Sequence, residues 1–357
     1  MEYVTLNNGI KMPMAGIGTF LLTPDEAEAS VLNALACGYR LIDTANAYVN
    51  EKAVGRAMKK SGVSREEIFL ETKLWPAFYE QSDAVEKTLE RLDTDYIDLL
   101  LIHQPAGNYI AGYKLMEKAY KEGKVKAIGL SNFSQSQIRE ILDICEVKPV
   151  VLQTEVHPYY QEKKLKDYLK KEGIVIQAWY PLGHGDKALL EEPLFQELGK
   201  KYGKSSAQII LRWHIQAGNI VIPGSKSPAH IQDNFDLFDF SLTAWEMAQI
   251  SIMDKNVRYY TSTPELLEKK IPVIFYYGDY IGEEFTDVPA AAMWGFMAST
   301  ADTFTTSYTA AGGISTVVHL PDEGITGNDH FMFQDMNNDV IAEHIENWIQ
   351  ANVMSAE

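Results

Sequence analysis

The sequence predicts an α/β fold: a (β/α)8 barrel of the TIM type that begins with a short β-hairpin and is followed by a small C-terminal segment. Eight short apolar runs recur within about 230 residues, each followed by an amphipathic stretch, as in such a barrel. The runs are continuous rather than alternating, which suits parallel strands covered on both faces. A doubly wound sheet usually carries a Gly-x-Gly-x-x-Gly turn after its first strand, and no such turn follows the first run here.

Composition narrows the class of protein. The 357 residues are 46% hydrophobic and 23% charged, which argues against collagen-like and disordered chains. Two cysteines cannot form a disulfide framework and favour a reducing compartment, and with no signal peptide we expect a cytoplasmic protein. No apolar run is long enough to span a membrane. The net charge of −17 argues against nucleic acid or an anionic membrane as a partner.

The elements follow in order along the chain. Residues 1–11 alternate around Asn7-Asn8-Gly9, which predicts the hairpin. The eight strands are expected at Gly16–Thr19, Arg40–Asp43, Phe69–Lys73, Ile97–His103, Ala127–Ser131, Val151–Glu155, Val175–Tyr180 and Ile220–Pro223. Helices are expected at Pro24–Cys37, Asp83–Leu92, Tyr113–Glu122, Ser134–Cys145, Lys163–Glu172, Ser205–Gln216 and Thr243–Asp254. Thr23 is expected to cap the first helix, and Asn132 or Ser134 the fourth.

Polar residues end three consecutive predicted strands: Asp43, Lys73 and His103, with Tyr48 five residues beyond Asp43. In a barrel these strand ends meet at one mouth. A lysine cation would lower the pKa of a nearby phenol from its usual value of about 10. An aspartate would hold the lysine in place, and a neutral imidazole would orient a carbonyl oxygen. The set predicts a site that polarises a carbonyl and protonates the developing alkoxide.

Each of these residues taken alone has an ordinary structural explanation. An aspartate after a strand usually forms a turn or caps a helix. A single lysine is usually solvated or ion-paired, a single histidine can be a packing residue, and a single tyrosine is most often a half-buried aromatic. The prediction therefore depends on their joint placement on successive strand ends.

Five segments, in order and with matching spacing, resemble the aldo-keto reductase superfamily. They are Leu41–Tyr48, Glu71–Trp75, Asp98–His103, Ala127–Phe133 and Val221–Ser225. The resemblance runs from about residue 3 to residue 268 and is greatest for the diketogluconate-reductase-like enzymes. It implies NADPH-dependent reduction of small aldehydes or ketones by hydride transfer, with Tyr48 as general acid.

The resemblance also implies the binding residues. Asp43, Lys73 and His103 would complete the catalytic tetrad with Tyr48. Phe20 and Trp75 would form apolar walls for the substrate. The implied cofactor residues are Gly18, Thr19, Ser131, Asn132, Gln153, Trp179, Ser225, Lys226, Ser227, His230, Asp233 and Asn234. No metal site is implied.

The sequence departs from the family pattern at the adenosine end of the cofactor site. Gly224 and His230 stand where the family often has a lysine and an arginine for the 2′-phosphate of NADPH. Lys226 could still meet that phosphate, as a point charge. NADPH is therefore the expected cofactor, with NADH as an alternative.

The segment 269–357 is expected to be a separate acidic unit. It holds 2 Lys+Arg and 13 Asp+Glu, a net charge of −11. Strands are expected at Ile271–Asp279 and Ser315–Leu320, and helices at Ala290–Ala311 and Asn338–Gln350. It resembles the end of an α/β-hydrolase, in which His330 would match the triad histidine and Asp279, Glu283 or Glu284 the acid. No Gly-x-Ser-x-Gly nucleophile occurs in the chain.

Two alternative functions remain open at this point. The C-terminal segment could block the pocket and leave a non-catalytic NADPH-binding subunit. A second chain could instead supply a serine to His330 and complete a hydrolase. The expected partners are a small carbonyl substrate and, through exposed strand edges of the C-terminal segment, a second copy of the chain.

Overall fold

The computed structural model describes residues 1–260, 273–277, 301, 305, 315–323, 343 and 345–348. The chain divides into two compact units, Met1–Pro264 and Glu265–Glu357. Among the described residues, no helix is long and apolar enough to cross a lipid bilayer.

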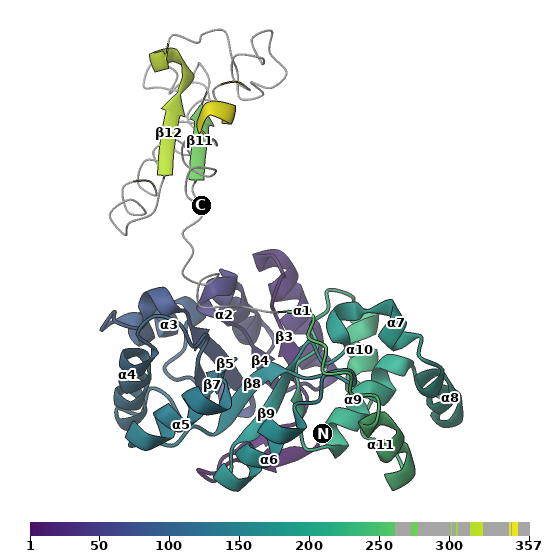
Figure 1. Cartoon of the computed structure of the whole chain (residues 1–357). Helices are drawn as coiled ribbons and strands as arrows, with labels where there is room; N and C mark the ends of the chain where they lie inside the picture. Colours follow the sequence, from purple (N-terminus) through teal and green to yellow (C-terminus); the bar gives the residue numbers. More distant parts are fainter. Residues whose placement is uncertain are drawn as a thin grey trace. The chain divides into compact units, whose positions relative to one another are not determined.

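The first unit is built on eight parallel strands that curl into a barrel (Figure 1). They are β3 (Ile17–Gly18), β4 (Leu41–Asp43), β5 (Phe69–Leu74), β6 (Leu99–Ile102), β7 (Ile128–Ser131), β8 (Val151–Glu155), β9 (Val175–Trp179) and β10 (Ile220–Val221). Each pairs with the next along the chain. The backbone of Val221 then bonds to Met14 O at 3.0 Å and Gly16 N at 2.8 Å, which joins the last strand to the first. The predicted barrel is confirmed.

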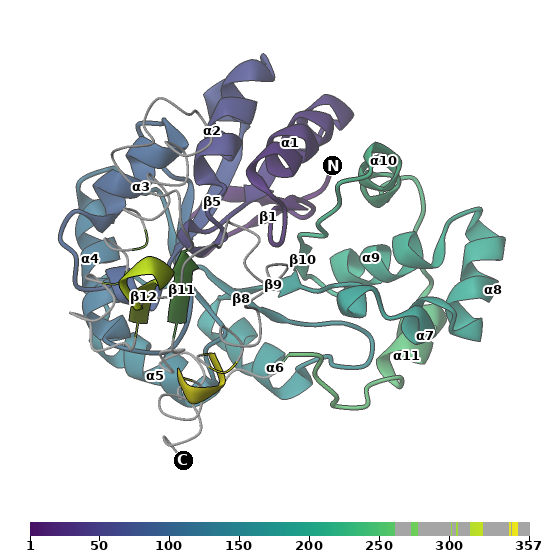
Figure 2. The same ribbon diagram turned by 90° about the horizontal axis from the view of Figure 1, so that it is seen from above.

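Helices surround the strands (Figure 2). They are α1 (Pro24–Cys37), α2 (Glu51–Lys60), α3 (Ala84–Leu92), α4 (Tyr109–Lys121), α5 (Gln135–Ile144), α6 (Lys163–Glu172), α7 (Lys187–Leu190), α8 (Pro193–Tyr202), α9 (Ser206–Gln216), α10 (Pro228–Phe235) and α11 (Ala244–Ser251). Four of these helices lie outside the stretches named from the sequence: α2, α7, α8 and α10. α4 begins four residues earlier than expected, because the Asn108 side chain accepts a bond from Ala111 N at 3.1 Å and caps it there.

Helix caps explain several boundaries. Thr23 caps α1 in a capping box with Glu26, as the sequence predicts. α1 ends at Gly38, whose φ of +104° lies in the left-handed region that favours glycine. Of the two candidates for α5, Ser134 is the cap, since its hydroxyl accepts from Gln137 N. The side chain of Asn132 instead makes hydrogen bonds at the mouth of the barrel.

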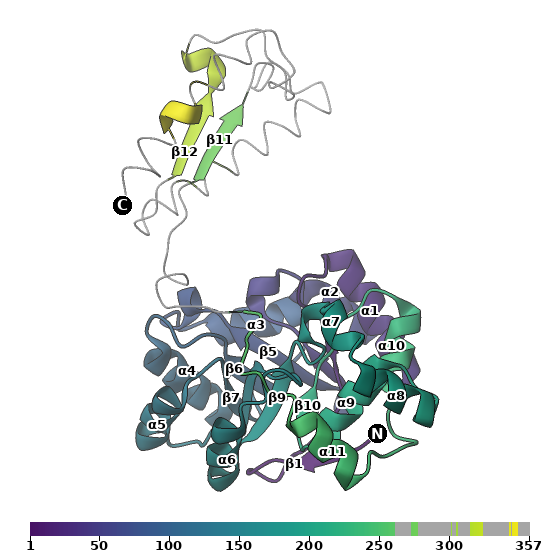
Figure 3. The ribbon, with the colours of Figure 1, turned by 45° about the vertical axis from the view of Figure 1, so that its right-hand side comes forward.

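The predicted hairpin lies at the end of the barrel where the strands begin (Figure 3). β1 (Tyr3–Thr5) pairs antiparallel with β2 (Lys11–Pro13). Leu6 and Met12 pack against Phe69 and Leu99, which come from the first halves of β5 and β6. The hairpin therefore closes the end of the barrel opposite the predicted site.

The second unit contains two of the predicted strands. β11 (Val273–Tyr277) and β12 (Ser315–His319) pair in parallel, and a 3-10 turn, η6 (Leu320–Glu323), follows. Trp348 Nε1 donates to Thr316 Oγ1 at 2.9 Å. Of the two predicted helices, only residues 301, 305, 343 and 345–348 are described, and they are helical. The hydrolase-like candidates lie outside the described residues: Asp279, Glu283, Glu284 and His330.

Candidate active site

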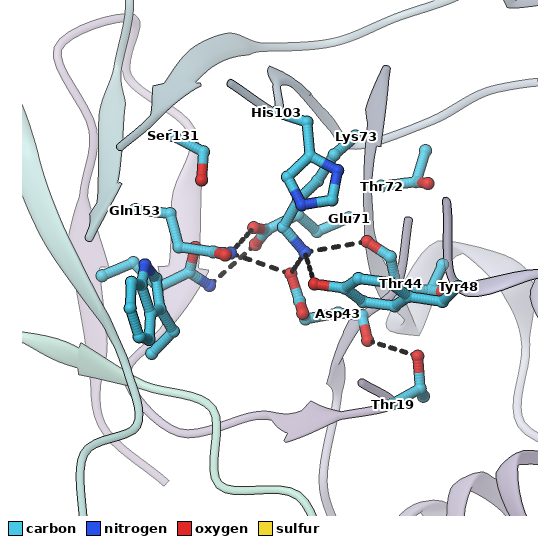
Figure 4. A network of polar contacts seen from close by, with 12 residues as sticks. Thr19, Asp43, Thr44, Tyr48, Glu71, Thr72, Lys73, His103, Ser131 and Gln153 are labelled. Carbon is cyan, nitrogen blue, oxygen red and sulfur yellow. Dashed lines mark hydrogen bonds and ion pairs between the residues drawn. The ribbon is translucent and has the colours of Figure 1, made fainter. Parts of the chain in front are cut away.

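Four side chains expected from the sequence lie together at the carboxyl ends of the strands (Figure 4). Asp43 is the last residue of β4, Lys73 is the second-last residue of β5, and His103 follows β6. Tyr48 lies in the 3-10 turn η1 (Asn46–Tyr48) above β4. Lys73 Nζ is 2.5 Å from Asp43 Oδ1 and 3.3 Å from Tyr48 Oη. The lysine thus joins a carboxylate to a phenol.

Burial dominates the electrostatics of this group. The side chains of Lys73 and Asp43 are 0% and 3% exposed. Burial lowers the pKa of Lys73, but Asp43, Tyr48 and Glu71 together outweigh it, so the net pKa is raised and the lysine stays charged. Burial also raises the pKa of Tyr48 to about 12, against the opposing effect of Lys73.

The high pKa of Tyr48 differs from the expectation. The sequence predicts that the lysine lowers the pKa of the phenol, because the residue types are visible in it. The depth at which the phenol is buried is not visible there, and burial proves the larger effect. The phenol is therefore protonated at neutral pH.

His103 is neutral at pH 7. Burial, with a smaller contribution from the Lys73 cation, holds the pKa of its imidazole well below the usual range. Its ring packs edge-on against Tyr48 and Trp75, with centroids 5.7 and 5.0 Å apart. Its Nδ1 is buried and has no partner among the described residues.

Asn50 holds the loop that carries Tyr48. Its Nδ2 donates to Thr19 O at 2.9 Å, and its Oδ1 accepts from Thr44 Oγ1 at 2.8 Å. The intervening Val49 has a φ of +59°, an uncommon conformation for a β-branched residue. Asn50 therefore fixes a strained turn beside the phenol, although nothing in the sequence pattern distinguishes it from an ordinary helix cap.

The expected nicotinamide residues lie beside the tetrad. Trp179, at the end of β9, donates from Nε1 to Asn132 Oδ1 at 2.9 Å. Asn132 Nδ2 donates to His103 O at 3.2 Å and to Ser131 Oγ at 3.1 Å. The polar atoms of Asn132 thus already have protein partners, and this residue fixes the indole of Trp179. The resemblance implies that Asn132 belongs to the cofactor site, and this role stays a prediction.

Gly18 has a structural reason to be glycine. A Cβ at this position would lie 2.7 Å from the backbone oxygen of Ile222, which directly follows the strand that closes the barrel. Thr19 follows it and donates from both its backbone nitrogen and its hydroxyl to Asp43 O, each at 3.0 Å. The two residues therefore anchor the first strand beside Asp43.

Gln153 connects Asp43 to two residues that the sequence analysis missed. Its Nε2 lies 2.8 Å from Asp43 Oδ1, 2.7 Å from Glu71 Oε1 and 3.0 Å from Gln177 Oε1. Burial and the nearby Asp43 carboxylate raise the pKa of Glu71 well above its usual range. Glu71 and Gln177 stand two residues before Lys73 and Trp179, so the two-residue period of a strand could have placed them on the same inner face.

The residues expected at the adenosine end gather at the start of α10. The Ser227 hydroxyl caps the helix by accepting from His230 N at 3.4 Å, and Ser30 Oγ donates to Ser225 O at 2.8 Å. Asn234 is buried, whereas His230 and Asp233 are exposed. Lys226 is 73% exposed and pairs with Glu26 at 3.1 Å.

Aromatic rings flank the tetrad. Phe20 is 47% exposed, and its ring centroid lies 5.0 Å from that of Tyr48. Tyr180 and Tyr260 are not among the site residues named from the sequence, and their ring centroids lie 4.9 and 6.0 Å from that of Trp179. Among the described residues, no group of three or more His, Cys, Asp or Glu side chains could hold a metal ion.

Comparisons with known proteins place this geometry among reductases. The model of the Aldo/keto reductase family matches residues 14–255. A glyoxal reductase of Bacillus subtilis is 44% identical over 271 residues, which cover 74% of this chain and 98% of that protein. The methylglyoxal reductase DkgA of Escherichia coli is 38% identical, over 71% of this chain and 94% of that protein.

Solved structures agree with the family match. A crystal structure of an aldo/keto reductase from Brucella melitensis aligns with a TM-score of 0.68 at 43% identity and covers 71% of this chain and 99% of that one. The aldo-keto reductase MGS-M4, from a deep-sea metagenome library, aligns with a TM-score of 0.71 at 41% identity, over 73% of this chain and 97% of that one.

Proposed function

The chain belongs to the aldo/keto reductase family and is an NAD(P)H-dependent oxidoreductase, and on this premise we propose that it reduces small aldehydes and ketones with NADPH. In this proposal Tyr48 is the general acid. The observation that carries it is the contact of Tyr48 Oη with Lys73 Nζ at 3.3 Å, where the lysine is itself held by Asp43 at 2.5 Å.

A bound nicotinamide cofactor would supply the hydride to the carbonyl carbon. Tyr48 would donate its phenolic proton to the carbonyl oxygen, on which negative charge would develop. Lys73 lies beside the phenolate that remains and stabilises its charge. Asp43 keeps the lysine charged and in place, so that little reorganisation is needed during the reaction.

His103 is proposed to orient the substrate. Because its imidazole is neutral, it has one N–H to donate to a carbonyl oxygen and adds no second positive charge beside Lys73. The edge-on packing against Tyr48 and Trp75 restricts the ring. The carbonyl oxygen would then lie between the imidazole and the phenol.

The residues fit a nicotinamide cofactor. Trp179, fixed by Asn132, offers an aromatic face for the nicotinamide ring. Gln153 and Ser131 offer polar atoms for its carboxamide. At the other end, Lys226 offers a positive charge for the 2′-phosphate, and we propose NADPH rather than NADH on this ground, with Gly18, Thr19 and the Ser225–Asn234 segment lining the site.

The test is the loss of NADPH absorbance with a panel of carbonyl compounds. Two relatives are named for glyoxal and methylglyoxal, so these dicarbonyls stand first on the panel. We expect Tyr48→Phe to lower kcat by about a hundredfold or more. The matched control is Tyr113→Phe on α4. It removes a hydroxyl that donates a hydrogen bond to Val147 O. Equal turnover by wild type and Tyr48→Phe would refute the assignment of the acid.

We further propose that the unit Glu265–Glu357 is the end of an α/β-hydrolase-like segment fused to the reductase, and that it mediates self-association. The parallel pairing of β11 and β12 supports the first part, since parallel strands need a long crossover between them. Light scattering of the full chain and of a chain ending at Leu267 tests the second part. If the full chain and the truncated chain had the same number of copies per particle, self-association through this unit would be refuted.

The same truncated chain tests the non-catalytic alternative. Tight NADPH binding without turnover in the full chain, and turnover after truncation, would show that the C-terminal unit is inhibitory. Labelling of the full chain by a serine-directed probe would favour the hydrolase alternative. We also propose a cytoplasmic location, which the free thiols of Cys37 and Cys145 support.

A further inference from the structure

Two carboxyl groups face two amides across the interior of the barrel. The register of β4 and β5 pairs Asp43 with Glu71, and the register of β8 and β9 pairs Gln153 with Gln177. All four residues are at most 2% exposed. Figure 4 shows the carboxyl groups of Glu71 and Asp43 next to the Gln153 amide nitrogen. Their orientation therefore depends mainly on the hydrogen bonds that they make to one another.

Glu71 accepts from both amides. Its Oε1 lies 2.7 Å from Gln153 Nε2, and its Oε2 lies 2.7 Å from Gln177 Nε2. Gln177 Oε1 in turn accepts from Gln153 Nε2 at 3.0 Å. Glu71 and Gln177 thus form a hydrogen-bonded unit that offers two acceptors to the NH2 group of Gln153, beside the acceptor of Asp43.

An amide has a donor end and an acceptor end, and its surroundings decide which faces inward. The NH2 group of Gln153 has two hydrogens and three acceptors within reach: Asp43, Glu71 and Gln177. Both hydrogens are therefore used inside the barrel. Among the described contacts, Gln153 Oε1 is the polar atom left for a ligand, and it can accept the N–H of a carboxamide.

We propose that Glu71 is a positioning residue, which holds the Gln153 amide with its oxygen presented to the carboxamide of the bound cofactor. The proposal rests on the cofactor contact of Gln153 proposed above. Without Glu71, Asp43 still accepts one N–H of Gln153, but Gln177 loses the acceptor that orients its own amide. Gln177 is then no longer held with its oxygen toward Gln153, and both amides gain freedom to rotate. An NH2 group turned toward the carboxamide would meet another donor instead of an acceptor. Cofactor binding should then weaken even though no cofactor contact has been removed.

A purely structural role makes the opposite prediction. Removing one partner of a buried polar group leaves the other partners unsatisfied and lowers the free energy of unfolding. If Glu71 serves stability alone, Glu71→Leu should lower the unfolding temperature, and the folded protein should bind cofactor as the wild type does. Binding measured at equilibrium separates the two roles without reference to turnover.

The experiment compares NADPH dissociation constants by isothermal titration calorimetry, with thermal unfolding of each variant. We expect Glu71→Leu to raise the Kd about tenfold, the equivalent of one lost hydrogen bond of ordinary strength. Glu71→Gln retains an acceptor oxygen and should recover most of the affinity. The matched control is Glu117→Gln, which alters a buried carboxylate that accepts from the backbone nitrogens of Glu146 and Val147 far from the mouth.

A second variant covers the case in which Glu71→Leu does not fold. If the unpaired amide of Gln177 prevents Glu71→Leu from folding, Glu71→Leu/Gln177→Leu removes that amide too, and the same loss of affinity is expected. A folded variant without Glu71 that binds NADPH within twofold of wild type overturns the proposal. So does failure of both variants to fold, since it assigns Glu71 to stability alone. A wild type that binds NADPH but reduces no carbonyl refutes the proposed function and leaves this comparison intact.

Discussion

Two lysines mark the two ends of the proposed cofactor site, and their surroundings differ sharply. Lys73 is 0% exposed and contacts Asp43, Thr44 and Tyr48. Lys226 is 73% exposed, and the contact described for it is a single ion pair with Glu26 at 3.1 Å. A buried charge acts at nearly full strength and cannot move, whereas an exposed one is screened by water and salt. The chemistry should therefore be intolerant of change and the cofactor preference tunable.

The largest effect is expected at the buried end. Lys73→Met removes the cation that stabilises a Tyr48 phenolate, so kcat should fall by about a thousandfold. It also leaves the Asp43 carboxylate buried without its partner, which should cost about 3–5 kcal/mol in the free energy of unfolding. Steady-state kinetics and urea unfolding measure the two effects.

A double variant separates activity from stability at the same place. In Asp43→Asn/Lys73→Met the unpaired charge is gone, so most of the lost stability should return while turnover stays low. If turnover returned together with stability, the lysine would act on folding alone. In that case Lys73 would differ from Lys226 in its contribution to stability and not in a role in catalysis.

At the buried end, the catalytic residues could be predicted from the sequence, but the hydrogen bonds around them could not. Asp43, Lys73 and His103 could be predicted because polar residues at the ends of apolar strands stand out in the chain. Gln153 could be named from the family resemblance. Its bonds to Glu71 and Gln177 could not, since they join strands far apart in the chain and depend on how the barrel closes.

The backbone conformation of Val49 and the burial of Tyr48 could not be predicted from the sequence either. The raised pKa of Tyr48 follows from burial that no residue pattern reports. The positive φ of Val49 depends on the bonds that Asn50 makes to other loops. At the exposed end, by contrast, the loss of two family cations was visible in the sequence. The pairing of Lys226 with Glu26 was not, because nearly two hundred residues separate them.

A smaller effect is expected at the exposed end. Lys226→Ala should weaken NADPH binding by roughly three- to tenfold and leave NADH binding unchanged, because only NADPH carries the 2′-phosphate. Glu26→Gln should act in the opposite direction, roughly two- to threefold, because it releases the lysine from its ion pair. Titration calorimetry with both cofactors at low and high salt measures this, and the differences should shrink in high salt.

The control at this end is Lys87→Ala. Lys87 is also exposed and forms an ion pair, with Asp83 on α3, but it lies outside the proposed site. If Lys87→Ala changed NADPH binding as much as Lys226→Ala, the effect would reflect overall charge. A change in NADH binding equal to that in NADPH binding would remove Lys226 from the 2′-phosphate.

The smallest effect is expected from pH, and it follows from burial. Reduction needs Tyr48 protonated, so the active form is present below the pKa of about 12 and lost only as the pH rises through it. Reduction also needs His103 neutral, and its lowered pKa keeps it neutral as the pH falls past its usual range. Between pH 6 and pH 10, kcat/KM for reduction should therefore change by less than about twofold. A fall in kcat/KM centred near pH 8 would mean that Lys73 overcomes burial and lowers the pKa of Tyr48 in the working enzyme, as the residue pattern alone predicts.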